Sequence, residues 1–165
     1  MNVLIDAIRP DDWMQVRAIF AEGIESGMST FETQPPEWES WDKGHLSVCR
    51  LAARQNERVV GWAALSPVSA RQAYAGVAEV SIYLTAAVRG QGVGKALLQE
   101  LIRLSETHGI WTLQAVIFPQ NIASLRLHEK CGFRLVGRRE RISKNRGAWQ
   151  DTILLERRSL VVGID

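Results

Sequence analysis

The segment Arg89-Gly90-Gln91-Gly92-Val93-Gly94-Lys95 places three glycines on alternate positions, between a strand-like run and a run with helical periodicity. Free N–H groups at a helix start and the helix dipole favour a bound anion, and glycines let the backbone approach a diphosphate closely. A P-loop would need Gly at position 89 and Ser or Thr at 96, where Arg and Ala stand. A dinucleotide-binding turn beginning at Gly92 would need Gly or Ala at 97, which is Leu. The segment therefore predicts either an anion-holding turn of another kind or a plain tight turn.

The rest of the chain alternates between strand-like and helix-like segments. Apolar residues recur at steps of three and four from Trp13 to Ile24, which predicts an amphipathic helix that Asp11 or Asp12 can cap. The expected strands cover residues 3–8, 51–55, 58–65, 77–84, 112–117, 133–142 and 149–156. The expected helices cover residues 13–26, with Gly27 breaking the first one, 37–46, 93–108 and 121–131. Strand–helix–strand units favour parallel pairing and hairpins are antiparallel, so we expect an α/β fold with a mixed sheet and helices on both faces.

Length and composition set broad limits on the class of protein. The 165 residues fit one domain, and 20 basic against 18 acidic residues, scattered in sequence, argue against nucleic acid as a partner. The two cysteines show no zinc spacing, so we expect no metal. We also expect no export, no membrane insertion and a cytoplasmic location. One basic cluster is interpreted as the solvated face of a strand pair, with an anion site as the alternative: Arg134, Arg138, Arg139, Arg141, Lys144 and Arg146.

The turn at 89–94 matches the Arg/Gln-x-x-Gly-x-Gly signature of the GNAT acetyltransferases. Residues 121–133 resemble that family's second CoA-contacting helix with its terminal Gly-Phe. The resemblance implies the GNAT fold, in which the mixed sheet is mostly antiparallel, as a single domain over residues 1–165. It also implies acetyl-CoA as a co-substrate whose pyrophosphate lies on the glycine turn.

Several segments are similar, more narrowly, to the phosphinothricin and methionine sulfoximine acetyltransferases: residues 29–33, 71–74, 126–129 and 147–151. This resemblance covers nearly the full length and implies acetylation of the α-amine of a small amino acid or analogue by a homodimer. Gln150 before Asp151 departs from the Gly-Trp-His-Asp-like ending of those enzymes, which leaves the substrate open.

Glu79 is the expected general base, because it is a carboxylate in the middle of a strand that otherwise favours burial. The alternative is that Glu79 is a structural carboxylate paired with an arginine such as Arg71. His128 stands where many relatives have a Tyr that protonates the departing thiolate, and a packed structural histidine is the alternative. Direct transfer in a ternary complex is expected, since Cys131 fits a packing residue better than a nucleophile.

The binding residues follow from the resemblance. The residues expected to contact acetyl-CoA are Ile82, Tyr83, Leu84, Arg89, Gly90, Gln91, Gly92, Val93, Gly94, Lys95, Asn121 and Ser124. Helix capping is the alternative for Asn121 and Ser124. For the acceptor, Arg71 is expected to pair with its carboxylate, and Phe31 and Tyr74 to line its pocket.

The sequence thus predicts an N-acetyltransferase acting on a small amino acid or analogue, of the phosphinothricin or methionine sulfone type. Two alternatives stay open. One is acetylation of another amine, such as a polyamine, an aminoglycoside or a protein N-terminus. The other is an acyl-CoA-binding sensor without turnover.

Overall fold

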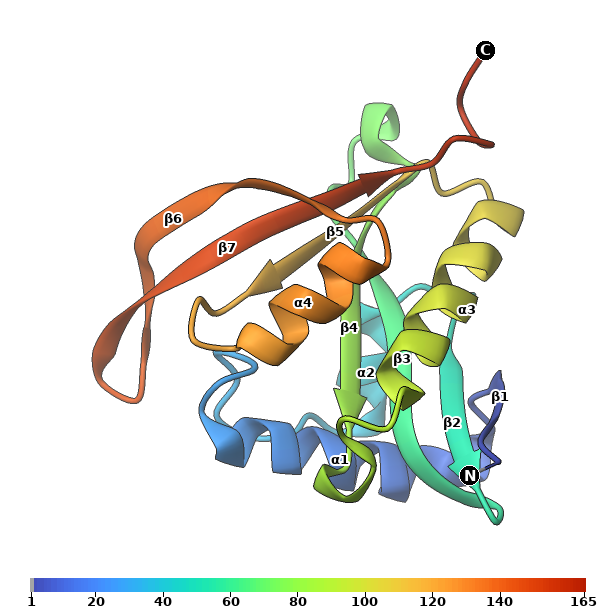
Figure 1. The fold of residues 1–165 in the computed structure, drawn as a ribbon, viewed down its shortest axis with the longest axis vertical. Coiled ribbons are helices and arrows are strands. Elements are labelled where there is room, and N and C mark those ends of the chain that lie inside the picture. Colours follow the sequence, from blue (N-terminus) through green and yellow to red (C-terminus); the bar gives the residue numbers. More distant parts are fainter. Residues whose placement is uncertain (1) are drawn as a thin grey trace.

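The computed structural model describes residues 2–165 (Figure 1). The strands are β1 (Leu4–Ala7), β2 (Leu51–Gln55), β3 (Arg58–Pro67), β4 (Val77–Leu84), β5 (Thr112–Ile117), β6 (Arg134–Asn145) and β7 (Ala148–Arg158). The α-helices are α1 (Trp13–Ser26), α2 (Trp38–Gly44), α3 (Val93–Thr107) and α4 (Ile122–Lys130). Short 3-10 turns, η1 (Pro10–Asp12), η2 (Gln72–Tyr74) and η3 (Ala86–Val88), precede α1, β4 and the glycine turn.

The sheet is seven-stranded, in the order β1-β2-β3-β4-β5-β7-β6. Its one parallel contact joins β4 to β5, and the other neighbouring strands run antiparallel. The mixed, mostly antiparallel sheet expected from the sequence is confirmed.

Helices cover both faces of the sheet, as the residues of β3 show. Ala63 and Leu65 pack in the core beneath α3, whereas Trp62 and Ala64 pack in a second core against α1 and α2. Figure 1 shows α3 in front of β2 and β3, with α2 behind them. Because successive side chains of a strand point to opposite faces, a strand between two helical layers is apolar along its whole length.

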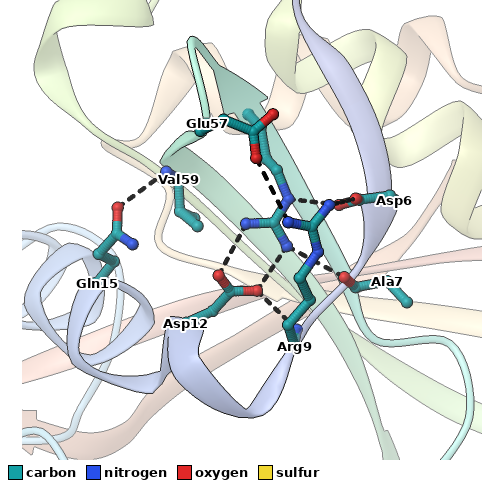
Figure 2. Close-up of polar contacts among 8 residues, drawn as sticks. Asp6, Ala7, Arg9, Asp12, Gln15, Glu57 and Val59 are labelled. Carbon is teal, nitrogen blue, oxygen red and sulfur yellow. Dashed lines mark hydrogen bonds and ion pairs between the residues drawn. The ribbon is translucent and has the colours of Figure 1, made fainter.

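A buried ion network ties β1 and the start of α1 to β2 (Figure 2). The guanidinium of Arg54 donates to both oxygens of Asp12, at 2.7 and 2.5 Å, and to Asp6 at 2.7 Å. Asp12 is the residue before α1, but its side chain makes no capping bond to the helix. Asp12 thus occupies the expected N-cap position, but the expected side-chain cap was wrong. Its carboxylate accepts hydrogen bonds from Arg54 and from the backbone N–H of Arg9 instead.

The β6–β7 hairpin is longer than expected from the sequence and projects from the rest of the sheet (Figure 1). Its two-residue turn, Arg146-Gly147, has positive φ at both positions, which matches the twist of the flanking strands. Register shifts after Leu135 and Arg139 let β6 continue to Asn145. Most of the basic cluster lies along this exposed strand, where Arg134 pairs with Glu156 and Arg138 with Asp151.

Candidate active site

The strands β4 and β5 pair over only three positions and then separate. The last paired residues are Glu79 and Gln114, after which β5 continues beside β7 alone. Residues 80–84 of β4 keep their pairing with β3 on one edge. Their other edge therefore offers backbone N–H and C=O groups to a ligand.

A groove of about 610 Å³ extends from this opening to the glycine turn. We call it the basic groove, since its charged lining residues are Arg89, Lys95, Arg126 and Lys130. Its other lining residues are Gly23, Ser26, Met28, Ser29, Ile82, Tyr83, Leu84, Gly90, Gly92, Gly94, Asn121, Ala123, Ser124 and Leu127. Four cations around backbone N–H groups make the groove electropositive, which suits a ligand with several phosphates.

The glycine turn has the backbone that its sequence requires. Gly90 and Gly92 have φ of 75° and 84°, in the left-handed region, and a Cβ at either position would meet no atom within 4 Å. Gly94, in the first turn of α3, faces Leu84 and Leu127, and a Cβ there would lie 3.1 Å from Leu84. The turn thus combines an open approach to backbone N–H groups with close packing of α3 against β4 and α4.

A second cavity, of about 540 Å³, lies beside the groove, and we name it the acceptor cavity after the second substrate that the sequence predicts. Its lining residues are Phe20, Ser29, Thr30, Phe31, Glu32, Pro36, Ser40, Trp41, Gly44, His45, Ser66, Glu79, Val80, Ser81, Ile82, Tyr83, Ala115, Val116, Ile117, Phe118, Asn121, Ser124 and His128. The residues common to both cavities are Ser29, Ile82, Tyr83, Asn121 and Ser124. The shared wall brings the basic groove next to a smaller, partly aromatic cavity.

Glu79 lines the acceptor cavity at the point where β4 and β5 separate. Its Oε1 accepts a hydrogen bond of 2.7 Å from Nε2 of Gln114, its neighbour across the parallel pair. The alternative pairing with Arg71 was wrong, because Arg71 lies in the exposed loop before η2, with its guanidinium 5.4 Å from the ring centre of Tyr74. The partner of Glu79 is therefore neutral.

His128 is buried in α4 and lines the same cavity. Its Nδ1 lies 2.8 Å from the carbonyl oxygen of Ser124, which fixes the proton on Nδ1. Burial lowers the pKa of His128, so the ring is neutral at neutral pH. A neutral ring whose N–H is already bonded to Ser124 is poorly arranged to protonate a thiolate.

The structure places most of the predicted site residues in the lining of the two cavities. The four exceptions are Arg71, Tyr74, Gln91 and Val93. Phe31 lines the acceptor cavity, packed edge-on against Phe118 at 4.9 Å. Arg71 and Tyr74 line neither cavity. Gln91 bonds to the carbonyl of Ala87, and Val93 is buried under the turn. Asn121 accepts from the N–H of Ser124, so it caps α4 and also lines both cavities.

The sequence analysis did not single out Glu32, Arg126 and Lys130, which line the two cavities, or Gln114, which bonds to Glu79. Arg126 and Lys130 are four residues apart, a spacing that puts both on one face of α4, so the signal was present. Gln114 had no such signal, since its contact with Glu79 depends on which strands are neighbours.

Comparisons with known proteins agree with this geometry. The model of the acetyltransferase (GNAT) family matches residues 13–133. The chain is 42% identical over 127 residues to YwnH of Bacillus subtilis, covering 74% of this chain and 78% of that protein. It is 32% identical over 160 residues to the phosphinothricin N-acetyltransferase of Alcaligenes faecalis, covering 93% and 81%. The structure of a GNAT superfamily phosphinothricin acetyltransferase from Sinorhizobium meliloti in complex with AcCoA is similar, with a TM-score of 0.89, 28% identity and coverage of 100% and 92%.

The groove lined by cations and the adjoining cavity with a carboxylate fit an enzyme that binds two substrates side by side. The family match and these relatives identify the chain as a member of the GNAT acetyltransferase family, and hence as an acetyl-CoA-dependent N-acetyltransferase. Among residues 2–165, no helix is long and apolar enough to cross a membrane, and no group of three or more potential metal ligands is present.

Proposed function

We propose that the protein transfers the acetyl group of acetyl-CoA to the α-amine of a small amino acid or amino-acid analogue, by direct attack with both substrates bound. The observation that carries this proposal is the position of Glu79, in the acceptor cavity at the point where β4 and β5 separate. Relatives named as phosphinothricin N-acetyltransferases support the acceptor class.

The basic groove has the chemistry that acetyl-CoA requires. Arg89, Lys95, Arg126 and Lys130 offset phosphate charge, and the free N–H groups of the turn around Gly92 accommodate a diphosphate. The free edge of β4 at residues 82–84 can pair with an amide-containing arm in the manner of an added strand. Bound acetyl-CoA supplies the reactive thioester, and a β4 backbone N–H is proposed to stabilise the charge that develops on its oxygen.

Glu79 is proposed to remove the proton that keeps the acceptor amine from attacking. An α-ammonium must become neutral before its nitrogen can form a bond, and a carboxylate within hydrogen-bond reach provides a base. The bond from Gln114 fixes one carboxylate oxygen, and no bond from the described residues occupies Oε2. Glu79 can therefore take the proton directly or through a water.

The acceptor class is tested by thiol release from acetyl-CoA with amino acids, methionine sulfone, methionine sulfoximine and phosphinothricin, with mass spectrometry of the products. Turnover of these amines supports the proposal. Turnover only of a polyamine, an aminoglycoside or a peptide N-terminus would replace the acceptor class. Acetyl-CoA binding without turnover of any amine would favour a sensor.

We further infer that residues 1–165 act as a single domain and that the active form is a cytoplasmic homodimer, as the resemblance to its relatives implies. Sedimentation velocity at assay concentrations tests the assembly. A dimer is expected, and a fully active monomer would contradict it.

A further inference from the structure

A row of polar side chains crosses one face of the sheet at the point where β4 and β5 separate. Its members pair in register across the neighbouring strands β3, β4, β5, β7 and β6, and they are Ser66, Glu79, Gln114, Glu156 and Arg134. Residues that pair directly across neighbouring strands have their side chains on the same face of the sheet. We call this set the polar row, since each of its side chains has polar neighbours on the adjoining strands.

The polar row lies on the side of the sheet where α1 and α2 pack. Ser66 is two residues beyond Ala64, which belongs to the core against these helices, so the two side chains share a face. On the opposite face, Ala78 and Leu113 precede two members of the row and pack in the core beneath α3. The row therefore runs on the side of the acceptor cavity, which both Ser66 and Glu79 line.

Within the row, Gln114 stands between two carboxylates and bonds to one of them. Its Nε2 donates to Oε1 of Glu79 at 2.7 Å. The other carboxylate, that of Glu156, is paired with the guanidinium of Arg134 on β6. An ionised carboxylate accepts hydrogen bonds and cannot donate them, so the amide of Gln114 must present its nitrogen and not its oxygen to Glu79. The row thus determines both the partner of Gln114 and the orientation of its amide.

A hydrogen-bond donor at position 114 restricts the rotation of the Glu79 carboxylate. With Oε1 held by Gln114, Oε2 has no bond from the described residues and is available to an amine in the acceptor cavity. A neutral donor achieves this without the positive charge of a lysine or arginine, which would offset the carboxylate's charge and repel an ammonium group. Resting on the proposed function, we propose that Gln114 is a positioning residue, whose amide holds the base Glu79 in the orientation in which it meets the acceptor amine.

Two variants remove the donor and keep the length of the side chain. Gln114→Met is nearly isosteric and cannot donate, and Gln114→Glu replaces the donor with an acceptor. Both should lower kcat at least about tenfold at pH 8, with KM for each substrate within about twofold of the parent value, because the base is still present but no longer held in place. Thr112→Val is the matched control: it makes a polar-to-apolar change two residues earlier on the same face of β5, outside both cavities, and should leave kcat unchanged.

A double-mutant cycle separates positioning of Glu79 from any other role of Gln114. If Gln114 acts through Glu79, Gln114→Met should lower kcat by no more than about twofold when Glu79→Gln is already present. An effect as large in that background as in the parent would show that Gln114 acts independently of Glu79 and would overturn the inference. A lower melting temperature of Gln114→Met with an unchanged kcat would overturn it too, since that pattern indicates a purely structural bond.

The pH dependence of Gln114→Glu adds a readout that a structural role would not change. Two neighbouring carboxyl groups readily share a proton, and a protonated carboxyl can again donate to Glu79. The kcat of Gln114→Glu relative to that of Gln114→Met should therefore rise as the pH falls from 8 to 5.5, and a constant ratio would contradict the need for a donor. Both variants share the other charged and titratable groups around the cavity and the row, so the effects of these groups cancel in the ratio. These groups are Glu32, His45, Tyr83, His128, Arg134 and Glu156.

The outcomes for the inference and for the proposed function can be told apart. A loss of kcat in Gln114→Met that requires Glu79 supports the inference. Parent-level kcat in Gln114→Met, together with a large loss in Glu79→Gln, would overturn the inference and leave the proposed function standing. Parent-level kcat in a stable Glu79→Gln protein would instead remove the base on which both depend.

Discussion

Gly92 is the N-cap of α3, and its φ lies in the left-handed region that residues with a side chain rarely adopt. A Cβ at this position would project into open space. The two facts have different consequences. The φ of 84° costs any other residue about 1 kcal/mol or more, wherever in a protein such a position lies. The open space belongs to the basic groove, where the phosphates of acetyl-CoA are proposed to bind and a side chain would compete with them.

Gly92→Glu should therefore weaken acetyl-CoA binding at least tenfold, because it places an anion and a side chain at the phosphate site. Gly109→Glu is the matched control, since Gly109 has φ of 76° and open space but lies outside the groove. Calorimetric titration of both variants separates lost binding from backbone strain. Near-native affinity of folded Gly92→Glu for acetyl-CoA would contradict the proposal that the glycine turn binds its phosphates.

Arg71 is predicted to pair with the acceptor's carboxylate, although it is exposed outside both cavities in the single chain. If it does so, the amide of a good amino-acid acceptor should have a lower kcat/KM than the acid, and Arg71→Ala should remove the difference. Arg139→Ala, on exposed β6, serves as the control. Equal kcat/KM for acid and amide with the unmodified protein would contradict this role.

At the scale of secondary-structure elements, the tip of the β6–β7 hairpin forms hydrogen bonds to the end of α1 and to Gly27, which follows it. Nδ2 of Asn145 donates to the carbonyl oxygen of Gly27 at 2.8 Å, and Nη2 of Arg146 donates to that of Glu25 at 2.6 Å. The loop beyond Gly27 supplies lining residues 29–32 of the acceptor cavity. The hairpin turn thus lies far from Glu79 in sequence but fixes one wall of the same cavity.

Asn145→Ala should lower the free energy of unfolding by about 1 kcal/mol and raise KM for the acceptor severalfold, with a smaller change in kcat. The matched control is Lys144→Ala, which loses only a contact of its ammonium with the ring of Trp149, at 5.2 Å. Thermal melts and steady-state kinetics of the two variants test this. An unchanged acceptor KM in Asn145→Ala would mean that the turn does not position the loop.

The anchor between Arg54 and Asp12 joins β2 to the start of α1 (Figure 2). Asp12→Asn should cost about 3–5 kcal/mol near neutral pH, because it leaves a buried guanidinium without its main counter-charge. The Arg54 hydrogen bond lowers the pKa of Asp12 from 3.8. The carboxylate's contribution is therefore present above that value and lost as pH falls through the lower pKa of the folded state.

Urea unfolding of the parent and Asp12→Asn from pH 6 down to pH 2.5 measures this contribution. The two free energies of unfolding should differ most at pH 6 and converge at the acid end. A difference that stays constant with pH would show that the charge of Asp12 is not what stabilises the anchor.

At the scale of the whole molecule, the sequence was sufficient to predict most helices and strands and to locate the glycine turn that lines the basic groove. Within residues 2–165, periodicity located the α-helices and the strands, with errors at their ends where capping and register decide, as at Asp12 and in β6. The glycine turn is local, so its residues stand together in sequence as they do in space.

The acceptor cavity depends on contacts between residues that lie far apart in the sequence, so the sequence alone did not predict them. Gln114 meets Glu79 because β4 and β5 are neighbours, and Glu32 lines the cavity from the loop that follows α1. The alternative for Glu79, pairing with an arginine such as Arg71, rested on charge alone, whereas the structure places the neutral amide of Gln114 beside it.

The most direct test of the account is the pH profile of Glu79→Gln, a change that keeps shape and volume and removes the basic carboxylate. We predict a fall in kcat of about 10²–10⁴-fold near pH 7, with the melting temperature and acetyl-CoA affinity preserved. Part of the deficit should be recovered toward pH 9, as more of the amine becomes neutral in solution. Parent-level kcat in a stable Glu79→Gln protein, or a loss of stability with an unchanged pH profile, would contradict the assignment of Glu79 as the base.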